Sequence, residues 1–277
     1  MNPELPPELP IGVFDSGVGG LTVLRALRRR LPHEDLLYLG DTARLPYGTK
    51  SRETIKRYAV QAASKLVERE VKMLVIACNT ATAAALDDLK SRWPGLPVVG
   101  VIEPGARAAC AASGSGAIAV IGTESTINNR AYHQAIELIN PGASVSARAC
   151  SLFVSLAEEG WLDGPVVEGT ARRYLEPLFS GAGAGAPDCL LLGCTHFPPL
   201  APAISRVLGR GVRIVDSAET TAVEVEERLS ALSSLNPQGG PGRARFMTTD
   251  DVARFARTGA IFLGEPLSFE DVELINL

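Results

Sequence analysis

The chain has 277 residues, of which 46% are hydrophobic and 21% are charged, a balance typical of a globular protein with one large domain or two ordinary ones. Its formal charge of −4 argues against a general nucleic-acid surface. No run of about 18 apolar residues is present, so the sequence predicts no membrane span. The five cysteines are scattered and form neither a disulfide framework nor a C-x-x-C metal site. We therefore expect reduced thiols and a cytoplasmic protein.

Residues 1–10 are rich in proline and acidic, and they lack the basic and apolar regions of a signal peptide. We expect them to form a disordered or loosely docked leader. Short apolar stretches without alternation follow, as in strands buried on both faces of a parallel sheet. In the first half we predict such strands at 11–14, 36–39, 73–77 and 97–102. Helices are predicted at 21–31, at 51–69 and from Thr80 onward.

The second half repeats this order of elements. Strands are predicted at 117–121, 144–149, 189–192 and 212–215. Helices are predicted after the strand end at 122–125 through about 139, at 166–179 and at 200–208. Taken in order, the strand ends of the two halves match as Asp15 with Gly122, Asp41 with Cys150, Cys78 with Cys194, and Glu103 with Asp216. We infer two similar α/β units. The inference depends on the matched Cys78 and Cys194, because a repeated order of strands and helices alone is common in α/β proteins.

The expected first domain comprises 11–103 plus 217–277, and the second comprises 104–216. The segment 103–105 is the predicted crossover between them, and 180–187 and 235–242 are predicted loops rich in glycine and proline. In the tail, 261–263 is a candidate strand, and the tail could return to cover the first unit.

Cys78 ends a predicted strand and starts a predicted helix. Ligands bind at such places in open α/β sheets, and a helix N-terminus lowers a thiol pKa and attracts anions. A lone cysteine there would more often be a small core residue. Cys194 stands at the end of a second such strand, followed by Thr195 and His196. The repetition favours a chemical role for both.

Several other kinds of site fit less well. The loop at 17–20 lacks the Lys-Ser/Thr ending of a P-loop and the G-x-G-x-x-G spacing, which disfavours nucleotide binding. A zinc site needs about four ligands, and none of the three histidines is suitably spaced. A hydrolase using one cysteine and one histidine would leave the second cysteine idle. A redox dithiol usually has both thiols within one motif.

Two thiols on opposite sides of one cleft suit proton transfer at a carbon atom. One thiolate could remove a proton from one face while the other thiol returns a proton to the opposite face. Asp15 and His196 are candidates to assist Cys78 and Cys194, although Asp15 could equally be a capping carboxylate.

Five ordered motifs resemble those of the bacterial glutamate racemases: DSGVGGLTV (15–23), DTARLPYG (41–48), ACNTATA (77–83), VIEPG (101–105) and LGCTHFP (192–198). The similarity extends into the tail at 246–250 and 262–264, and leaves out the leader and the 181–186 loop. Phe197 is a mild departure, because many members have Tyr there.

This resemblance implies two pseudo-twofold-related α/β domains, each a mostly parallel sheet flanked by helices, with the active site in the cleft between them. It also implies interconversion of L- and D-glutamate for peptidoglycan precursors, without a cofactor or metal, in an enzyme that we expect to be a homodimer. Cys78 and Cys194 match the family's two bases, acting on D- and L-glutamate respectively, and Asp15 and His196 match its assisting residues. The matching substrate-binding positions are Asp15, Ser16, Tyr47, Gly48, Asn79, Thr80, Thr123, Thr195 and His196.

Two other functions compete with this one. Aspartate racemases use the same two-thiol plan, but the related ones usually carry Glu in place of His196, so the sequence favours glutamate. Inhibition of a topoisomerase, attributed to some glutamate racemases, would be a second function, and no feature of this sequence argues for it.

Overall fold

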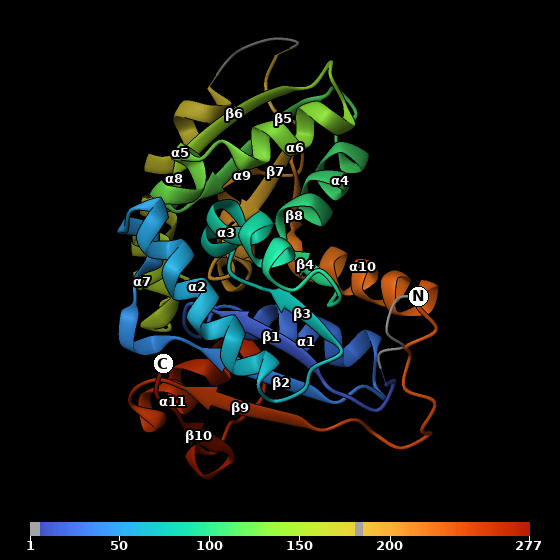
Figure 1. Ribbon diagram of the computed structural model, residues 1–277. Helices are drawn as coiled ribbons and strands as arrows, with labels where there is room; N and C mark the ends of the chain where they lie inside the picture. The colour runs from blue at the N-terminus through green and yellow to red at the C-terminus, as the bar shows by residue number, and fades with distance from the viewer. Residues whose placement is uncertain (1–5, 181–184) are drawn as a thin grey trace.

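The computed structural model describes residues 6–180 and 185–277, and these form two α/β domains, each built on a parallel sheet (Figure 1). The six-stranded sheet has the order β10-β9-β2-β1-β3-β4. Its strands are β1 (Ile11–Asp15), β2 (Leu36–Gly40), β3 (Met73–Ile76), β4 (Val98–Gly100), β9 (Ala244–Thr248) and β10 (Val272–Leu274). The four-stranded sheet has the order β6-β5-β7-β8, with β5 (Ala117–Gly122), β6 (Ser144–Ala149), β7 (Cys189–Gly193) and β8 (Arg213–Asp216). The predicted fold class is confirmed.

Helices flank both sheets. Around the six-stranded sheet lie α1 (Leu21–Arg30), α2 (Arg52–Val67), α3 (Asn79–Arg92), α10 (Ser217–Ala231) and α11 (Val252–Leu263). Within 102–208 lie α4 (Ile102–Ala112), α5 (Glu124–Asn128), α6 (Ala131–Ile139), α7 (Leu152–Glu158), α8 (Pro165–Phe179) and α9 (Ala201–Leu208). Short 3₁₀ turns are η1 (Thr42–Arg44), η2 (Tyr47–Thr49), η3 (Pro198–Leu200) and η4 (Phe269–Asp271). Among the described residues, no helix is both long and apolar enough to cross a membrane.

The strand order shows the internal duplication directly. In the first sheet β2, β1, β3 and β4 lie side by side, and in the second sheet β6, β5, β7 and β8 repeat that arrangement. Cys78 follows β3 and Cys194 follows β7, so the two thiols stand at equivalent strand ends.

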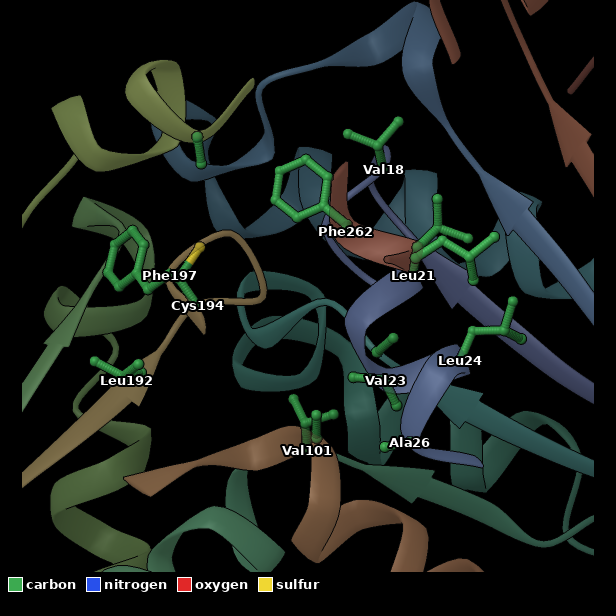
Figure 2. Close-up of a cluster of buried hydrophobic side chains, with 14 of the residues drawn as sticks. Val18, Leu21, Val23, Leu24, Ala26, Val101, Leu192, Cys194, Phe197 and Phe262 are labelled. Atoms are coloured by element: carbon green, nitrogen blue, oxygen red, sulfur yellow. The ribbon is translucent and has the colours of Figure 1, made fainter. Parts of the chain in front are cut away.

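Both faces of the six-stranded sheet are buried, which explains why its strands are continuously apolar. Alternate residues of β1 and β3 pack into different clusters. Val13 and Val75 join the cluster that contains α1, α10 and α11, whereas Phe14 and Ile76 join the cluster that contains α2 and α3. The first cluster also reaches the second sheet. Figure 2 shows Cys194 and Phe197 in this cluster, which also holds Val18, Leu21 and Phe262.

Two sequence predictions of local structure were wrong. The helix predicted to follow 122–125 and to run to about 139 is broken into α5 and α6 at Arg130, which has a left-handed backbone (φ 53°). Residues 261–263 are the end of α11 and not a strand. The predicted crossover at 103–105 lies in the first turn of α4, where Pro104 needs no donor. Residues 181–184, half of the loop predicted at 180–187, lie outside the described residues.

Candidate active site

Cys78 is held where β3 gives way to α3. It is the N-cap of α3, and its sulfur accepts a hydrogen bond from the Ala81 N–H at 3.4 Å. The thiol can donate to the Ser16 hydroxyl, with 3.4 Å between sulfur and oxygen. The side chain is only 4% exposed, and burial, with a further contribution from the nearby Asp15 charge, raises the pKa of Cys78 to about 12. Cys78 is therefore a thiol at neutral pH.

Asp15 ends β1 and is completely buried behind Cys78. Its Oδ2 accepts a hydrogen bond from the Gly17 N–H at 2.9 Å, and its Oδ1 has no hydrogen-bond partner among the described residues. Burial raises the pKa of Asp15, although the charge of His196 and the neighbouring backbone N–H groups act in the opposite direction. Gly20 permits this packing, since a Cβ atom there would lie 2.5 Å from the Asp15 Cβ.

Cys194 follows β7 and faces a histidine. Its sulfur lies 3.9 Å from Nδ1 of His196, and the other ring nitrogen, Nε2, lies 3.0 Å from Oε1 of Glu158 on α7. The glycine loop after β1 packs against His196 and Thr195, because a Cβ at Gly19 would lie 2.5 Å from His196 Nδ1 and from Thr195 Oγ1. The first domain's loop thus packs directly against the second domain's strand end.

His196 and Glu158 form a largely buried ion pair. Burial alone would lower the pKa of His196, but its hydrogen bonds to Cys194 and Glu158 outweigh that effect and raise the pKa to about 10. Burial likewise opposes ionisation of Glu158, and the hydrogen bond with His196 outweighs it and lowers the Glu158 pKa. Glu158 Oε2 also lies 3.8 Å from Arg254. His196 is therefore a cation at neutral pH.

A cavity of about 240 Å³ brings the candidate residues together. Of the eleven site residues expected from the sequence, ten line it: Ser16, Tyr47, Gly48, Cys78, Asn79, Thr80, Thr123, Cys194, Thr195 and His196. The remaining one, Asp15, lies behind Cys78 and is not part of the lining. The lining comes from both domains, so the cavity lies between them; it is called the catalytic cavity below.

Comparison with known proteins identifies the family of this chain. The family model for Asp/Glu/Hydantoin racemases matches residues 12–225. The chain belongs to this family. It is 52% identical to a glutamate racemase of Geobacter metallireducens over 267 residues, covering 96% of each chain. It is 48% identical to that of Syntrophus aciditrophicus over 277 residues, covering 100% of both. The resemblance seen in the five motifs is thereby confirmed.

Solved racemase structures share the whole architecture. A Francisella tularensis glutamate racemase in complex with D-glutamate superposes with a TM-score of 0.89 at 37% identity, covering 98% of each chain. A Thermus thermophilus glutamate racemase in complex with β-chloro-D-alanine gives a TM-score of 0.86 at 45% identity, again covering 98% of each. A Pyrococcus horikoshii aspartate racemase homologue is 17% identical, with a TM-score of 0.54 over 80% of this chain and 99% of that one, and shares the fold.

Hydroxyl and amide side chains alternate with apolar ones in the walls of this racemase's catalytic cavity, and no lysine or arginine of the described residues lines it. Thr80 Oγ1 lies 2.9 Å from Thr123 Oγ1, which joins the start of α3 to the N-cap of α5 across the two domains. Asn79 Nδ2 donates to the Tyr132 hydroxyl at 2.7 Å, which fixes the amide at the first turn of α3. Hydroxyls and backbone N–H groups at a helix N-terminus can bind carboxylates without a cationic side chain.

Glu158 is the site residue that the sequence did not reveal. It lies on α7, a helix of seven residues that was not predicted and that has no side-chain N-cap. It reaches His196 from 38 residues away in the chain. Its carboxylate also lines a second cavity of about 430 Å³, together with Asp250, Asp251 and Arg254; this outer cavity shares Leu45, Pro46, Val154 and Ser155 with the catalytic cavity.

Within the described residues, no three His, Cys, Asp or Glu side chains are grouped so as to hold a metal ion. The catalytic cavity is lined by two thiols and one imidazolium, and the carboxyl group of Asp15 is buried outside its lining.

Proposed function

We propose that the protein is a glutamate racemase in which one thiolate removes the α-proton and the other thiol returns a proton to the opposite face. The observation that supports this most strongly is that Cys78 and Cys194 follow equivalent strands of a duplicated fold and line the same cavity. Two acid–base groups contributed by two halves of a cleft can act on opposite faces of one carbon.

In the direction from D-glutamate, Cys78 is the base. Its S–H proton must first leave, and the neighbouring Asp15, whose pKa burial raises, is the acceptor that the geometry supports. The C–H bond then breaks as an S–H bond forms at Cys78, and the S–H bond at Cys194 breaks as a new C–H bond forms on the opposite face. One proton is taken and one is returned, so the reaction needs no oxidant or reductant.

In the reverse direction, Cys194 starts as the thiolate that the forward reaction leaves and takes the proton of L-glutamate, while Cys78, which is then a thiol, returns a proton to the opposite face. The cationic His196 beside Cys194 stabilises negative charge on that side of the cavity. Asp15 and His196 thus assist different thiols.

We assign the substrate's carboxylates to the polar walls. Ser16, Asn79, Thr80, Thr123 and Thr195 present hydroxyl and amide groups, and Tyr47 and Gly48 close the cavity on the η2 side. A Cβ at Gly48 would lie 2.8 Å from the Thr123 Cβ, so glycine allows the two domains to meet there. A pocket fitted to the longer glutamate side chain should misplace the Cα of aspartate.

We also propose a domain division, an oligomeric state and a cellular role for the protein. The domain division is 11–103 plus 217–277 and 104–216, supported by the pairing of β9 with β2 in the first sheet. The enzyme acts as a homodimer in the cytoplasm and supplies D-glutamate for peptidoglycan. Analytical ultracentrifugation would test the dimer, and rescue of a bacterial strain that requires D-glutamate would test the supply role.

The decisive experiment is circular dichroism of L- or D-glutamate incubated with the purified enzyme. The protein should first be dialysed against a chelator and treated to strip pyridoxal phosphate, and the optical signal should still decay to zero from both enantiomers. Aspartate should react about a hundredfold more slowly, the effect that a misplacement of about 1 Å can have. Activity that returns only with metal or pyridoxal phosphate, or comparable kcat/KM for the two amino acids, would refute the corresponding part of the proposal.

A further inference from the structure

The catalytic cavity adjoins two other cavities, and these differ in charge. The outer cavity is lined by three carboxylates, those of Glu158, Asp250 and Asp251, and by one cation, Arg254. On the other side, a cavity of about 370 Å³ is lined by two cations, Lys50 and Arg52, and by one carboxylate, Glu124. This second cavity, called the mouth below, shares Gly48 and Thr49 with the catalytic cavity.

The mouth lies between the domains. Gly48 and Thr49 belong to η2, and Arg52 begins α2, whereas Glu124, Ser125 and Asn128 come from α5. The η2 turn packs against α5, and Figure 1 shows the start of α2 facing α5. Gly48 meets Thr123 between these two cavities, so a small molecule passes from the mouth into the catalytic cavity only when η2 and α5 move apart.

The two cations of the mouth are available for a ligand. Among the described residues neither Lys50 nor Arg52 forms an ion pair, and Arg52 is exposed to solvent. Arg52 Nε makes a long hydrogen bond of 3.5 Å to the Ala84 carbonyl oxygen, which keeps its side chain near the second turn of α3. Most other arginines around α1 are paired with carboxylates, for example Arg28 with Glu265 and Arg30 with Glu226.

We propose that glutamate enters the catalytic cavity through the mouth and that Lys50 and Arg52 attract it there. This proposal rests on the function proposed above. Glutamate carries two carboxylates and one ammonium group, so it is an anion approaching a protein whose formal charge is −4. A local excess of positive charge at one opening raises the concentration of an anion there, whereas the acidic outer cavity repels it.

The expected effect is on encounter and not on chemistry. Neither cation lines the catalytic cavity, so neither should stabilise the transition state. Attraction at the mouth therefore raises kcat/KM and leaves kcat unchanged. Because the two enantiomers have equal free energy in water, kcat/KM must change by the same factor in both directions.

The test compares charge variants of the mouth at several ionic strengths. Replacing both cations (Lys50→Gln with Arg52→Gln) should lower kcat/KM by about 10-fold at low salt, the lower end of the range for electrostatic steering. Both kcat values should remain at the wild-type level. The decline of wild-type kcat/KM with added salt should be flattened in the double variant, because screening acts on the same attraction. Glu124→Gln should change kcat/KM in the opposite direction.

Matched controls separate position from net charge. Arg57→Gln removes the same charge from the same helix but does not line the mouth, and should leave kcat/KM unchanged. The exchange Lys50→Arg with Arg52→Lys keeps the charges and should retain wild-type kinetics, which also controls for folding. Asp250→Asn in the outer cavity should have no effect.

The possible outcomes distinguish this inference from the function on which it rests. Wild-type enzyme that does not racemise glutamate would overturn both. If racemisation is normal and kcat/KM of the double variant depends on salt as that of the wild type does, only the proposal of entry through the mouth is overturned. A rise in kcat/KM for Asp250→Asn, with no change for the Lys50 and Arg52 variants, would instead assign entry to the outer cavity.

Discussion

Cys78 and Cys194 occupy equivalent places in the two sheets, yet the groups around them differ in charge. Cys78 lies beside the Ser16 hydroxyl and in front of Asp15, a carboxyl group without access to solvent. Cys194 lies beside His196, a cation that is paired with the partly exposed Glu158. Cys78 thus faces a buried carboxyl group. Cys194 faces an imidazolium whose partner, Glu158, lines the outer cavity.

This difference shows what the duplication has kept and what it has changed. The strand order, and the position of a thiol after the third strand of each unit, are the same in both. The assisting side chains are not equivalent, since Asp15 follows the first strand of its unit whereas His196 follows the same strand as its thiol. Racemisation interconverts two mirror-image molecules, but the protein assists the two proton transfers with different side chains.

The largest effect should come from removing either thiol. Cys78→Ser and Cys194→Ser should each lower racemisation by about 10²- to 10⁴-fold or more, the usual contribution of a general acid or base, because a serine hydroxyl is a far weaker base than a thiolate. Loss of the circular dichroism change is the measurement. Racemisation near the wild-type rate in either variant would eliminate the two-thiol mechanism.

Racemisation rates alone cannot say which thiol serves which enantiomer, since kcat/KM must be equal in the two directions. A glutamate analogue that loses a leaving group after deprotonation needs only one base and is consumed irreversibly. With it, Cys78→Ser should spare chiefly the L-form, and Cys194→Ser chiefly the D-form. Early in a reaction in deuterated water, wild-type enzyme should place deuterium mainly in the product enantiomer. Equal processing of both analogues by both variants would contradict the assignment of opposed bases.

The sequence predicted the thiol pair and most of the lining, because each of these residues directly follows a strand or begins a helix. Cys78, Asn79 and Thr80 are one such run, and Cys194, Thr195 and His196 are another. The carboxyl ends of parallel strands meet at one edge of a sheet, so short sequence patterns were enough to predict which residues lie together there.

The parts that could not be predicted depend on contacts that are distant in sequence. Glu158 faces His196 because α7 packs beside η3, and nothing in its local sequence marks it as a partner of a histidine. The helix α11 contains a short apolar run at 261–263 that fits a strand or a helix equally well. Its ending at Gly264, which has a left-handed backbone, is the local signal that favours a helix.

A smaller effect should distinguish the two assisting groups. Glu158→Gln keeps a hydrogen-bonding partner for His196 but removes the charge, and Asp15→Asn does the same behind Cys78. A hydrogen bond to a charged group contributes about 1.5–3 kcal/mol, which corresponds to roughly a 10- to 100-fold change in rate. With the eliminating analogue, Glu158→Gln should slow mainly the L-form and Asp15→Asn mainly the D-form. Equal slowing of both forms by either variant would mean that the two halves of the site are not independent.

The smallest effect concerns pH. His196 has a pKa raised to about 10 from an ordinary value of 6.5, so its stabilising contribution is fully present below pH 6.5 and is lost as the pH rises towards 10. The pKa of Glu158 is lowered, so its contribution is present above its ordinary value of 4.5 and is lost as the pH falls through its lower folded-state pKa. The ion pair therefore stabilises the fold most between about pH 4.5 and 6.5.

Glu158→Gln removes the carboxylate that helps to keep His196 protonated, so the alkaline decline of kcat/KM should move to lower pH by roughly one unit, the equivalent of about 1.4 kcal/mol. The substrate's own ammonium group titrates in the same range, but it does so identically for both proteins, so the difference between the two profiles isolates His196. Denaturant unfolding at pH 6 and pH 10 supplies a second readout: wild type should exceed Glu158→Gln in stability at pH 6, and the gap should narrow at pH 10. Glu159→Gln is the matched control, because it removes the same charge from the next residue, which is exposed to solvent, and it should leave the position of the alkaline decline unchanged. A wild-type profile that declines near pH 6.5, or an unshifted profile in Glu158→Gln, would show that His196 is neutral in the working enzyme and that the contrast between the two thiols is not one of charge.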